Sequence, residues 1–482
     1  MGCFKLKGQK EEELTRFSDK KKLSVSKKVF IKQRKCKVSD HYEILKKIGD
    51  GSYGQVFLVK HIHSKTERAM KSIPLSQTID IDQLMIEVNV LKELDHPNIV
   101  RIFEVINDSK CLNIVMEHCT GGELYEKIKK SNHFSESLAS QYMFDIVSAI
   151  KYCHEAKLVH RDLKPENVLF ESDKDETRLK LIDFGTSKYF KPNERMQKFI
   201  GTSYYVAPEV IDKNYDEKCD VWSLGIMLYA MLCGIPPFVG ETNDEIFGKI
   251  KNNKVSFKSE CWKCVSKEAK SLIRHMLIKD PTKRPTIHEI YLDPWIQNKK
   301  SRVSDMPIAK KTLENMQNFQ AECNLKKITM SYIVSQLIVS EEVNDLRNIF
   351  HSLDKNGDGK LSKEELLEGF QDASVIVGFN IDEIFQECDA DGNGYVDYTE
   401  FLTAASNWQK IASRERLKAA FNAYDQDGNG KISPQELVNA LKSSGIDKKL
   451  IKDMIEAADT NGDGEMDFNE FEQIMMKAGN RV

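Results

Sequence analysis

The sequence predicts an α+β chain in which a mixed domain of strands and helices precedes a smaller all-α module. Two observations lead to this prediction. Strand-like apolar runs at 42–48, 56–59 and 111–116 alternate with helical patterns over the first 300 residues. Four acidic twelve-residue segments then recur in the last third of the chain at offsets of 35, 36 and 34 residues. A regular repeat of this kind is one structural unit used several times.

The bulk composition is that of an ordinary globular protein with room for several domains. A chain of 482 residues suggests about three domains. Charged residues make up 30% and hydrophobic ones 40%, which is typical of soluble globular proteins. The most apolar run, Leu224 to Ile235, is shorter than the roughly 20 residues that span a bilayer and ends in two prolines. We expect a buried core helix there.

The cysteines indicate a reducing compartment. Eleven are scattered through the chain without a dense framework, and no secretory signal is recognisable, so we expect an intracellular, cytoplasmic protein. Cys261 and Cys264 form a CxxC pair with no second pair nearby. A structural zinc site needs four ligands at suitable spacings, so we interpret this pair as two small side chains near a helix start.

The two ends of the chain carry opposite charge. Residues 1–40 hold thirteen Lys or Arg against five Asp or Glu, whereas residues 341–482 hold fifteen against twenty-nine. A basic end indicates an anionic surface as its partner, and an acidic end indicates cations.

The N-terminal segment, residues 1–41, offers two lipid attachment points. Gly2 and Cys3 are followed by Lys5, Lys7 and Lys10, and stable anchoring needs a second acyl chain or such a basic patch. The myristoylation pattern has Ser or Thr at the sixth position, where this chain has leucine. Two interpretations stay open: a membrane-associated protein acylated at Gly2 and Cys3, or a solvated tail.

The segment from His160 to Asn167, reading HRDLKPEN, places an acid, a lysine and an amide at fixed offsets. In phosphoryl transfer an Asp orients the attacking hydroxyl and accepts its proton, a Lys screens the migrating phosphate, and an Asn completes the metal shell. Asp162, Lys164 and Asn167 are the candidates for these roles. The segment resembles the catalytic loop of protein kinases.

A glycine-rich stretch, GDGSYGQV, lies between two strand-like runs. In dinucleotide-binding folds such a stretch opens a helix, whereas here a strand pattern resumes at Val56, which favours a hairpin over phosphates. Fifteen residues beyond Val56 lies Lys71, where a kinase has the lysine that holds the α and β phosphates. Glu87, on a helical pattern, is the candidate partner of Lys71, and Glu93 is the competing assignment.

Further motifs of the same family follow in order at kinase-like spacings. No catalytic position is missing, which argues against a degenerate kinase, and the resemblance implies a bilobal protein-kinase fold. The motifs are DFG at 183–185, APE at 207–209, DVWSLG at 220–225 and Arg284 within DPTKRPT.

The resemblance also implies ATP and Mg²⁺ as cofactors. Asp183 and Asn167 would hold the metal, because Mg²⁺ favours hard oxygen ligands, and Arg284 would pair with Glu209. The backbone at Glu117 and Cys119 would bind adenine, with Met116 closing the back of the pocket. The implied nucleotide site consists of Ile48, Gly49, Asp50, Gly51, Ser52, Tyr53, Gly54, Gln55, Val56, Ala69, Lys71, Met116, Glu117 and Cys119.

Two acidic residues indicate the substrate class. Glu123 and Glu166 match positions that, in kinases preferring basic substrates, receive an Arg before the phosphoacceptor. The resemblance therefore implies protein substrates with basic residues near Ser or Thr. Exposed polar surface is the simpler interpretation of each glutamate.

The activation segment predicts that the switch lies elsewhere. Many kinases with an arginine at the position of Arg161 use it to clasp a phosphorylated loop residue, but residues 188–201 contain no Ser or Thr, and Lys198 stands at the usual place. Thr202 instead matches a residue that hydrogen-bonds within the catalytic site. Activation by phosphorylation of this loop is not expected.

The junction, residues 297–340, carries two apolar stripes with helical spacing. Leu313, Met316 and Phe319 form the first, and the second is longer. Between a kinase and an acidic module, such a helix is expected to change partners, as amphipathic helices do in calcium-sensor grooves. Lys326 precedes Thr329 as in a basic-directed site, so the helix either blocks the substrate cleft or acts elsewhere. The second stripe is Met330, Ile333, Val334, Leu337 and Ile338.

Residues 341–482 contain four calcium-loop patterns. Each has side-chain oxygens at positions 1, 3 and 5, Gly at 6, an apolar residue at 8 and Glu at 12, which suits the six to eight oxygens that Ca²⁺ takes. The position-8 residues Leu361, Val396, Ile432 and Met466 suit short strands that pair two loops, giving two lobes. Asp397 and Asp467 at position 9 suggest tighter binding in loops 2 and 4. The ligand positions are Asp354, Asn356, Asp358, Lys360, Glu365; Asp389, Asp391, Asn393, Tyr395, Glu400; Asp425, Asp427, Asn429, Lys431, Glu436; and Asp459, Asn461, Asp463, Glu465, Glu470.

Across residues 42–482 the chain resembles the calcium-dependent protein kinases of plants and protists. The resemblance implies a monomeric serine/threonine kinase, with a kinase domain at 42–296 and a calmodulin-like domain at 341–482, that Ca²⁺ activates by withdrawing the junction helix. It implies no nucleic-acid partner. The alternatives are a calcium-sensing adaptor with a kinase-like docking domain, and a kinase activated by external calmodulin, which four intact loops disfavour.

Overall fold

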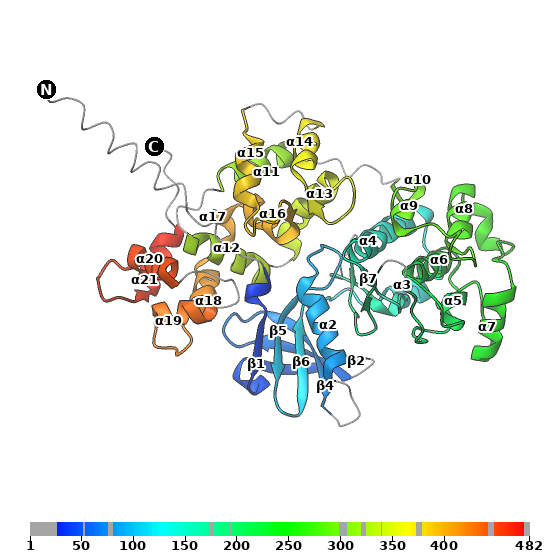
Figure 1. Ribbon diagram of the computed structural model, residues 1–482, viewed down its shortest axis with the longest axis horizontal. Helices are drawn as coiled ribbons and strands as arrows, with labels where there is room; N and C mark the ends of the chain where they lie inside the picture. Colours follow the sequence, from blue (N-terminus) through cyan, green and yellow to red (C-terminus); the bar gives the residue numbers. More distant parts are fainter. Residues whose placement is uncertain are drawn as a thin grey trace.

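The computed structural model describes residues 27–51, 54–75, 81–173, 178–191, 194–297, 306–319, 324–338, 340–372, 378–441 and 448–476. A two-lobed domain runs from residue 27 to residue 297, and an EF-hand module runs from 306 to 476. Figure 1 shows the module, yellow to red, beside the strand-rich lobe, with the helical lobe in green at the other end. Gly2, Cys3, Ser52 and Tyr53 lie outside the described residues.

A six-stranded sheet in the order β1-β5-β6-β4-β3-β2 forms the first lobe, together with helix α2 (Ile81–Glu93). All neighbouring strands are antiparallel except β1 and β5, which are parallel. The glycine-rich stretch joins β2 to β3 as the predicted hairpin. The strands are β1 (Lys32–Lys35), β2 (Tyr42–Gly51), β3 (Gly54–His61), β4 (Glu67–Pro74), β5 (Ile102–Asn107) and β6 (Cys111–Met116).

Strand β1 has no counterpart in the sequence pattern. Its residues, KQRK, are all polar, and apolar alternation is what normally predicts a strand. The strand forms because its backbone pairs with the sheet edge at β5 and because Arg34 forms an ion pair with Glu104 at 2.9 Å. Residues 27–35, here called the N-terminal strap, therefore belong to the folded part of the chain.

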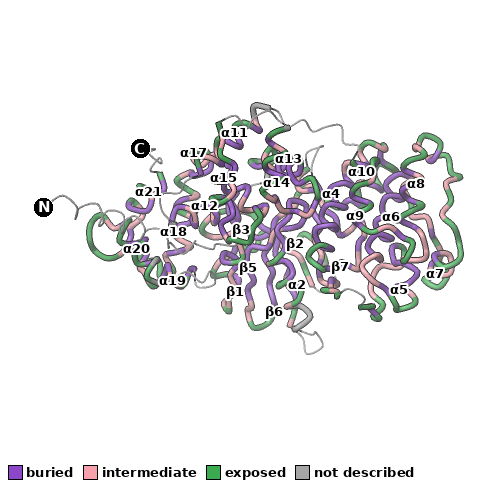
Figure 2. The backbone as a smooth tube through the Cα atoms, turned by 45° about the horizontal axis from the view of Figure 1, so that its top comes forward, coloured by how far each residue is buried: buried purple, intermediate pink, exposed green. Residues whose placement is uncertain are grey.

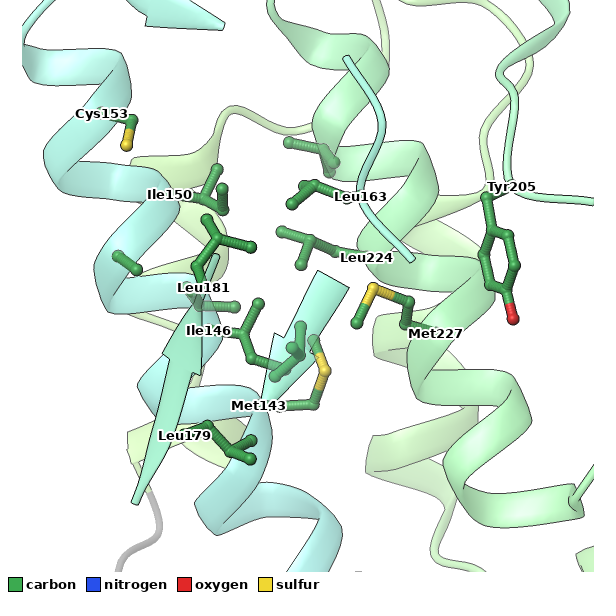
Figure 3. Packing of buried hydrophobic residues seen from close by; sticks show 14 of the residues in the cluster. Met143, Ile146, Ile150, Cys153, Leu163, Leu179, Leu181, Tyr205, Leu224 and Met227 are labelled. Carbon is green, nitrogen blue, oxygen red and sulfur yellow. The ribbon is translucent and has the colours of Figure 1, made fainter. Parts of the chain in front are cut away.

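The second lobe is built around helices α4 (Glu136–Glu155) and α6 (Lys218–Cys233). Leucine, isoleucine and methionine side chains from α4, α6 and β9 (Leu179–Leu181) meet between them (Figure 3). Residues 219–232 of α6 are all buried, which confirms the predicted core helix up to Leu232, but the prediction was wrong at the end of the apolar run, because Ile235 lies beyond the helix and is 58% exposed. The helix ends at Cys233 because Gly234 takes a left-handed conformation, with φ of 83°.

The remaining elements of this lobe surround that core. Figure 2 shows buried backbone along α4 and α6 and more exposed backbone around α7 at the outer end. These elements are α3 (Leu124–Ser131), β7 (Leu158–Val159), β8 (Val168–Phe170), β10 (Lys188–Tyr189), α5 (Pro208–Ile211), α7 (Asn243–Asn252), α8 (Lys267–Met276), α9 (Ile287–Tyr291) and α10 (Pro294–Gln297). Among the described residues, no helix is long and apolar enough to cross a membrane.

The EF-hand module consists of two pairs of helix–loop–helix units. The predicted strand pairing is present, because Leu361 lies opposite Val396 and Ile432 lies opposite Met466. The first pair comprises α13 (Asn344–Leu353), β11 (Lys360–Leu361), α14 (Lys363–Asp372), α15 (Ile381–Cys388), β12 (Val396–Asp397) and α16 (Tyr398–Ala405). The second comprises α18 (Arg414–Tyr424), β13 (Lys431–Ile432), α19 (Pro434–Ala440), α20 (Lys448–Ala458), β14 (Met466–Asp467) and α21 (Phe468–Met476), after the connecting α17 (Trp408–Ile411).

The junction forms two helices, α11 (Met306–Gln317) and α12 (Asn324–Gln336), that lie within the EF-hand module. All eight residues of the two predicted stripes are buried in one cluster with the EF-hand helices. Helix α12 packs against α16 of the first pair and α18 of the second. At the end of α12, the carbonyl of Gln336 accepts a hydrogen bond from Arg68 of the first lobe at 3.1 Å, and just beyond the helix the carbonyl of Ile338 accepts one from Arg101 at 3.3 Å.

The first EF-hand pair packs against the two-lobed domain. Both terminal nitrogens of Arg347 donate to the carboxylate of Glu171, at 2.5 and 2.9 Å, and Arg347 is only 1% exposed. Calcium loop 1 also meets the domain closely, because a Cβ placed on Gly359 would lie 2.4 Å from the ring of Tyr152. The module is thus held on the domain by charge and by close packing.

Candidate active site and calcium loops

The catalytic loop brings the predicted acid, lysine and amide together. Thr202 donates from its hydroxyl to Asp162 Oδ1 at 2.8 Å, and Lys164 Nζ lies 3.0 Å from both Asp162 Oδ2 and Thr202 Oγ1. The Asn167 amide donates to the Asp162 carbonyl at 2.8 Å. The Asp162 carboxylate is therefore held by the Thr202 hydroxyl on one oxygen and by the Lys164 ammonium on the other.

A fully buried aspartate holds the backbone of this loop. Asp220, on the first turn of α6, accepts hydrogen bonds from the amides of His160 and Arg161, both at 2.9 Å. Arg161 adopts a φ of 73°, which is unfavourable for a residue with a Cβ. The two amide bonds to Asp220 compensate for this strain and fix the residue that precedes Asp162.

The structure places Glu87, not Glu93, beside Lys71. Lys71 Nζ lies 2.8 Å from Glu87 Oε1 and 3.3 Å from Asp183 Oδ1. Burial opposes the charge on Lys71, but the two carboxylates outweigh it and raise the pKa of Lys71. Glu93, the last residue of α2, instead meets Lys28 and the hydroxyl of Tyr189.

Asp183 is held as a carboxylate. Burial would raise its pKa, but Lys71, the amide of Gly185 and His160 together lower it below its usual value. The residue before Asp183, Ile182, donates its amide to the Asn167 carbonyl at 3.1 Å, so the two candidate ligands lie on neighbouring segments. The amide nitrogen of Asn167 is bonded to the Asp162 carbonyl. A carboxylate and an amide oxygen are hard oxygen donors of the kind that Mg²⁺ prefers, so the residues fit that ion.

The predicted nucleotide residues that the structure describes come from the hairpin and from neighbouring strands of the first lobe. Ala69 of β4 is the register partner of Met116 at the end of β6, so the two lie side by side. Ile48 of β2 keeps 41% of its surface exposed although it is apolar, as expected for a side chain that covers an adenine ring. Gly49 pairs with Val56, Asp50 with Gln55 and Gly51 with Gly54 in the hairpin above.

The segment after β6 is held in place by charges. The Glu117 amide donates to the Arg101 carbonyl at 2.9 Å, and its carboxylate contacts Arg101 at 3.2 Å and Lys180 at 3.2 Å. The side chain of Glu117 is thereby turned into the protein. Its backbone and that of Cys119 remain the groups suited to an adenine base.

The two substrate-side glutamates lie close enough to influence each other. Burial, followed by the charge of Glu166 and then that of Glu126, raises the pKa of Glu123. Among the described residues, the buried Oε2 atom of Glu166 has no hydrogen-bond partner. An unsatisfied buried carboxylate oxygen next to a second carboxylate is a favourable position for a cation.

The activation segment is fixed without a phosphate group. The guanidinium of Arg161 donates to the carbonyls of Thr186 and Ser187, at 2.6 and 3.4 Å. At the other end, Arg284 contacts Glu209 through two bonds of 2.5 and 2.9 Å. Arg161 therefore has backbone partners in the place where other kinases present a phosphorylated residue.

Calcium loops 2 and 3 gather three of their predicted ligands each. Single ligand atoms from Asp389, Asp391 and Glu400 all lie within 4.8 Å of one another, as do those of a matching set in loop 3. Glu400 accepts the amides of Ala390 and Asp391 at one oxygen and that of Asp397 at the other. Oxygens crowded in this way fit Ca²⁺. The loop 3 set is Asp425, Asp427 and Glu436.

The ligand pKa values differ between the two pairs. Burial, followed by the charge of Asp358, raises the pKa of Asp354 to about 7, and burial with neighbouring carboxylates raises that of Glu400 to about 8. In the second pair, burial acts in the same direction, but hydrogen bonds outweigh it and lower the pKa of Glu436 and Glu470.

Several residues that join the parts of the chain were not found from the sequence. Asp95, Glu171 and Arg347 lie outside any recognisable motif, and Thr399 stands between two ligand positions of loop 2. Their partners are 50 to more than 300 residues away, so no local periodicity marks them. The only signal was that Asp95 lies two residues after the end of the helix that carries Glu87.

Comparisons with known proteins agree with this division of the chain. A family model described as the protein kinase domain matches residues 42–296, and one described as an EF-hand domain pair matches 343–406 and 414–476. Calcium-dependent protein kinase 4 of Plasmodium falciparum (isolate 3D7) is 36% identical over 471 residues, covering 94% of this chain and 89% of that protein. Calcium-dependent protein kinase 11 of Oryza sativa subsp. japonica is 37% identical over 452 residues, covering 93% and 78%. Calcium-dependent protein kinase 13 of Arabidopsis thaliana is 36% identical over 449 residues, covering 92% and 84%.

Proposed function

The chain belongs to the calcium-dependent protein kinases, and from this premise we propose how its residues carry out calcium-activated transfer of the ATP γ-phosphate to Ser or Thr. The observation that carries the proposal is that one chain combines a complete catalytic set with an EF-hand module whose helices bury the junction helices. An adaptor would not need Lys71, Glu87, Asp162 and Asp183 in bonding geometry.

Asp162 is the base of the transfer. Its carboxylate orients the substrate hydroxyl and accepts its proton, while Thr202 and Lys164 keep it in position. Lys71, held by Glu87, binds the nucleotide phosphates, and Asp183 with Asn167 would hold Mg²⁺. The metal, when bound, neutralises charge on the β and γ phosphates. Lys164 adds a cation beside the γ-phosphoryl group as it passes from ADP to the substrate hydroxyl.

Calcium acts by favouring the arrangement seen here. Helices α11 and α12 lie in the EF-hand module, away from Asp162, with their apolar stripes covered. When Ca²⁺ is absent, α12 is released from these grooves and inhibits the kinase domain. Moving the active fraction from 1% to 99% requires about 5.5 kcal/mol of differential binding, which several calcium sites acting on one helix can provide.

The substrates are proteins with an arginine or lysine near the phosphoacceptor. Glu123 and Glu166 support this preference, since the raised pKa of Glu123 and the unsatisfied oxygen of Glu166 would both be relieved by a cation. A peptide containing Arg before Ser should be phosphorylated more efficiently than the same peptide with Ala. Replacing Glu123 by Gln should reduce that difference.

One assay tests the function as a whole. Purified protein is incubated with MgATP and an Arg-containing Ser peptide, with calcium or with chelator, alongside an Asp162→Asn variant. We expect calcium-stimulated transfer that falls by a factor of about 100 or more in the variant. Equal transfer with chelator would reject the switch, and no transfer in either condition would favour the adaptor.

We also propose that the chain is acylated at Gly2 and Cys3 and that the acylated protein associates with a membrane. Gly2 and Cys3 offer two acyl sites beside a basic patch, and two signals are what stable anchoring needs. A Gly2→Ala variant should then move from the membrane fraction to the supernatant. Unchanged membrane retention would reject this part of the proposal.

A further inference from the structure

The loop that follows α2 is where three distant segments of the chain meet. Helix α2 carries Glu87, and its end continues through Leu94 into Asp95 and His96. Asp95 is only 8% exposed, and His96 only 3%. No catalytic role requires a buried aspartate at this position, so its partners indicate what it does.

Two of these partners come from opposite ends of the chain. Thr399 donates to Asp95 through its amide (to Oδ2, 3.0 Å) and its hydroxyl (to Oδ1, 3.0 Å). Lys27 of the N-terminal strap donates to Asp95 Oδ1 at 3.1 Å and also to the carbonyl of Leu94. The Asp95 amide donates to the hydroxyl of Tyr152 at 2.9 Å, which fixes the backbone.

Thr399 connects Asp95 directly to calcium loop 2. It is position 11 of that loop, next to Glu400 at position 12, and it lies in the first turn of α16. Amides at the start of a helix lack intrahelical partners and favour a negative group. Asp95 is therefore a cap for α16 supplied by the kinase domain, one residue from a calcium ligand.

The strap supports the same loop from the other side. Its β1 strand pairs with β5, Lys32 donates to the Ala423 carbonyl of α18 at 3.1 Å, and the Phe30 ring lies 5.5 Å from that of Tyr332 on α12. Lys27 thus reaches Asp95 from a segment that touches the sheet, the junction helix and the second EF-hand pair. The side chain of Lys27 is only 13% exposed, and its ion pair with Asp95 is the main interaction that offsets the cost of burying its charge.

We propose that Asp95 is a positioning residue for phosphoryl transfer, which couples calcium loop 2 to Glu87 by holding the end of α2. Glu87 lies about two helical turns before Asp95, so a shift at the end of α2 moves Glu87 relative to Lys71. Calcium binding orders Glu400, and the adjacent Thr399 then holds Asp95. This inference rests on the proposed function and adds the route by which one calcium site reaches the nucleotide site.

The test measures coupling between two ligands in the full chain. Calcium binding is titrated by calorimetry with and without Mg²⁺ and a non-hydrolysable ATP analogue. Because coupling is reciprocal, nucleotide should tighten calcium binding in the parent protein by about tenfold. Thr399→Val, which removes only the hydroxyl, and Asp95→Asn should each lose most of this factor. Thr399→Ser, which keeps the hydroxyl, should retain it.

A matched control uses the same position in another loop. Asn469 is position 11 of loop 4, next to Glu470, and its side chain is exposed. Asn469→Val should keep the parent coupling. Hydrogen exchange of residues 81–93 in the presence of calcium and nucleotide gives a second readout, which should become faster in Thr399→Val and Asp95→Asn but not in Asn469→Val.

The outcomes separate this inference from the proposed function. Parent-like coupling and exchange in Thr399→Val would overturn the inference while leaving calcium-stimulated transfer intact. Loss of coupling in both Thr399→Val and Asn469→Val would also overturn it, because the effect would then not require Asp95. Absence of phosphate transfer by the parent protein would reject the kinase activity, whatever the coupling. If Asp95→Asn does not fold, Thr399→Val alone decides.

Discussion

The two EF-hand pairs share one loop pattern but meet the rest of the molecule in different ways. In loop 1, a Cβ on Gly357 would lie 2.4 Å from the ring of Tyr291, and one on Gly359 would lie equally near Tyr152. In both loops of the second pair, the glycines at these positions have nothing within 4 Å. The glycines of loop 2 are equally open, and that loop meets the kinase domain through Thr399 instead. The same sequence pattern thus produces a docking surface in one place and an open loop in another.

This difference shows that loop residues which do not ligate calcium are free to contact the kinase domain. The first pair meets the kinase domain through Gly357, Gly359, Arg347 and Thr399. The second pair reaches it mainly through intermediaries, the strap and α12. We therefore expect substitutions in the first pair to affect the assembly, and matched ones in the second pair to remain local.

The largest difference in stability is expected from the ion pair between Arg347 and Glu171. Arg347→Met removes both bonds to the buried carboxylate of Glu171, which then keeps Lys180 at 3.4 Å, and should lower the free energy of unfolding in urea by about 3 kcal/mol. The control is Arg414→Met in the second pair, whose ion pair with Glu472 has a side chain 68% exposed. It should change stability by less than about 0.5 kcal/mol. Equal effects would contradict the comparison.

The next effect concerns the glycines. Gly357 and Gly462 both have left-handed backbones, with φ of 72° and 77°, so alanine costs each about the same, roughly 1 kcal/mol. Only Gly357→Ala also places a methyl group against Tyr291, which should cost about a further 1–3 kcal/mol. Thermal unfolding of the two calcium-loaded variants measures the difference. A Gly462→Ala variant that is the less stable of the two would refute it.

A smaller difference is expected between the terminal glutamates. Glu400→Gln weakens the loop whose Thr399 contacts the kinase domain, whereas Glu470→Gln weakens an open loop. We expect the calcium concentration for half-maximal activity to rise by about fivefold in the first and less in the second. Peptide phosphorylation across a calcium series gives both values. The reverse order would support the alternative that loop 4 dominates through Asp467 at position 9.

The smallest effect is a pH dependence confined to the first pair. Because Asp354 and Glu400 have a raised pKa of about 7 and about 8, calcium must displace protons from them at neutral pH. The calcium affinity of loop 1, which contains Asp354, should rise by about threefold between pH 6.5 and 7.5, and that of loop 2 should rise in the same direction, with proton release seen by calorimetry in two buffers. In the calcium-free protein, Asp354 and Glu400 ionise at a lower pH in the unfolded chain than in the folded one. The free energy of unfolding should therefore fall as pH rises from about 4 to about 8. The lowered pKa of Glu436 and Glu470 predicts no such release from the second pair.

Local motifs made much of the architecture predictable. The catalytic loop, the glycine hairpin and the calcium loops each require particular residues at short fixed spacings, so Asp162, Lys71 and the loop ligands could be named from the sequence. The apolar stripes of the junction likewise predicted two buried helices, and all eight stripe residues are buried. Periodicity gave the helix that carries Glu87 but left Glu93 as an alternative.

What the sequence did not reveal depends on long-range pairing. Strand β1 is polar throughout, so its formation depends on the β5 edge and on Glu104, about 70 residues away. The role of Asp95 can be recognised only from its contacts with Lys27 and Thr399, which the fold brings beside it. Periodicity reports which face of an element is buried, but it does not report which distant segment covers that face.

The parallel pairing of β1 with β5 has a further consequence for self-association. An unpaired strand edge is a template on which another chain can add a strand. In this structure the strap covers the β5 edge with its own backbone, so the sheet offers that edge to no other molecule. Loss of the strap would expose it, and the chain would then be open to strand addition by a peptide or by a second copy of itself.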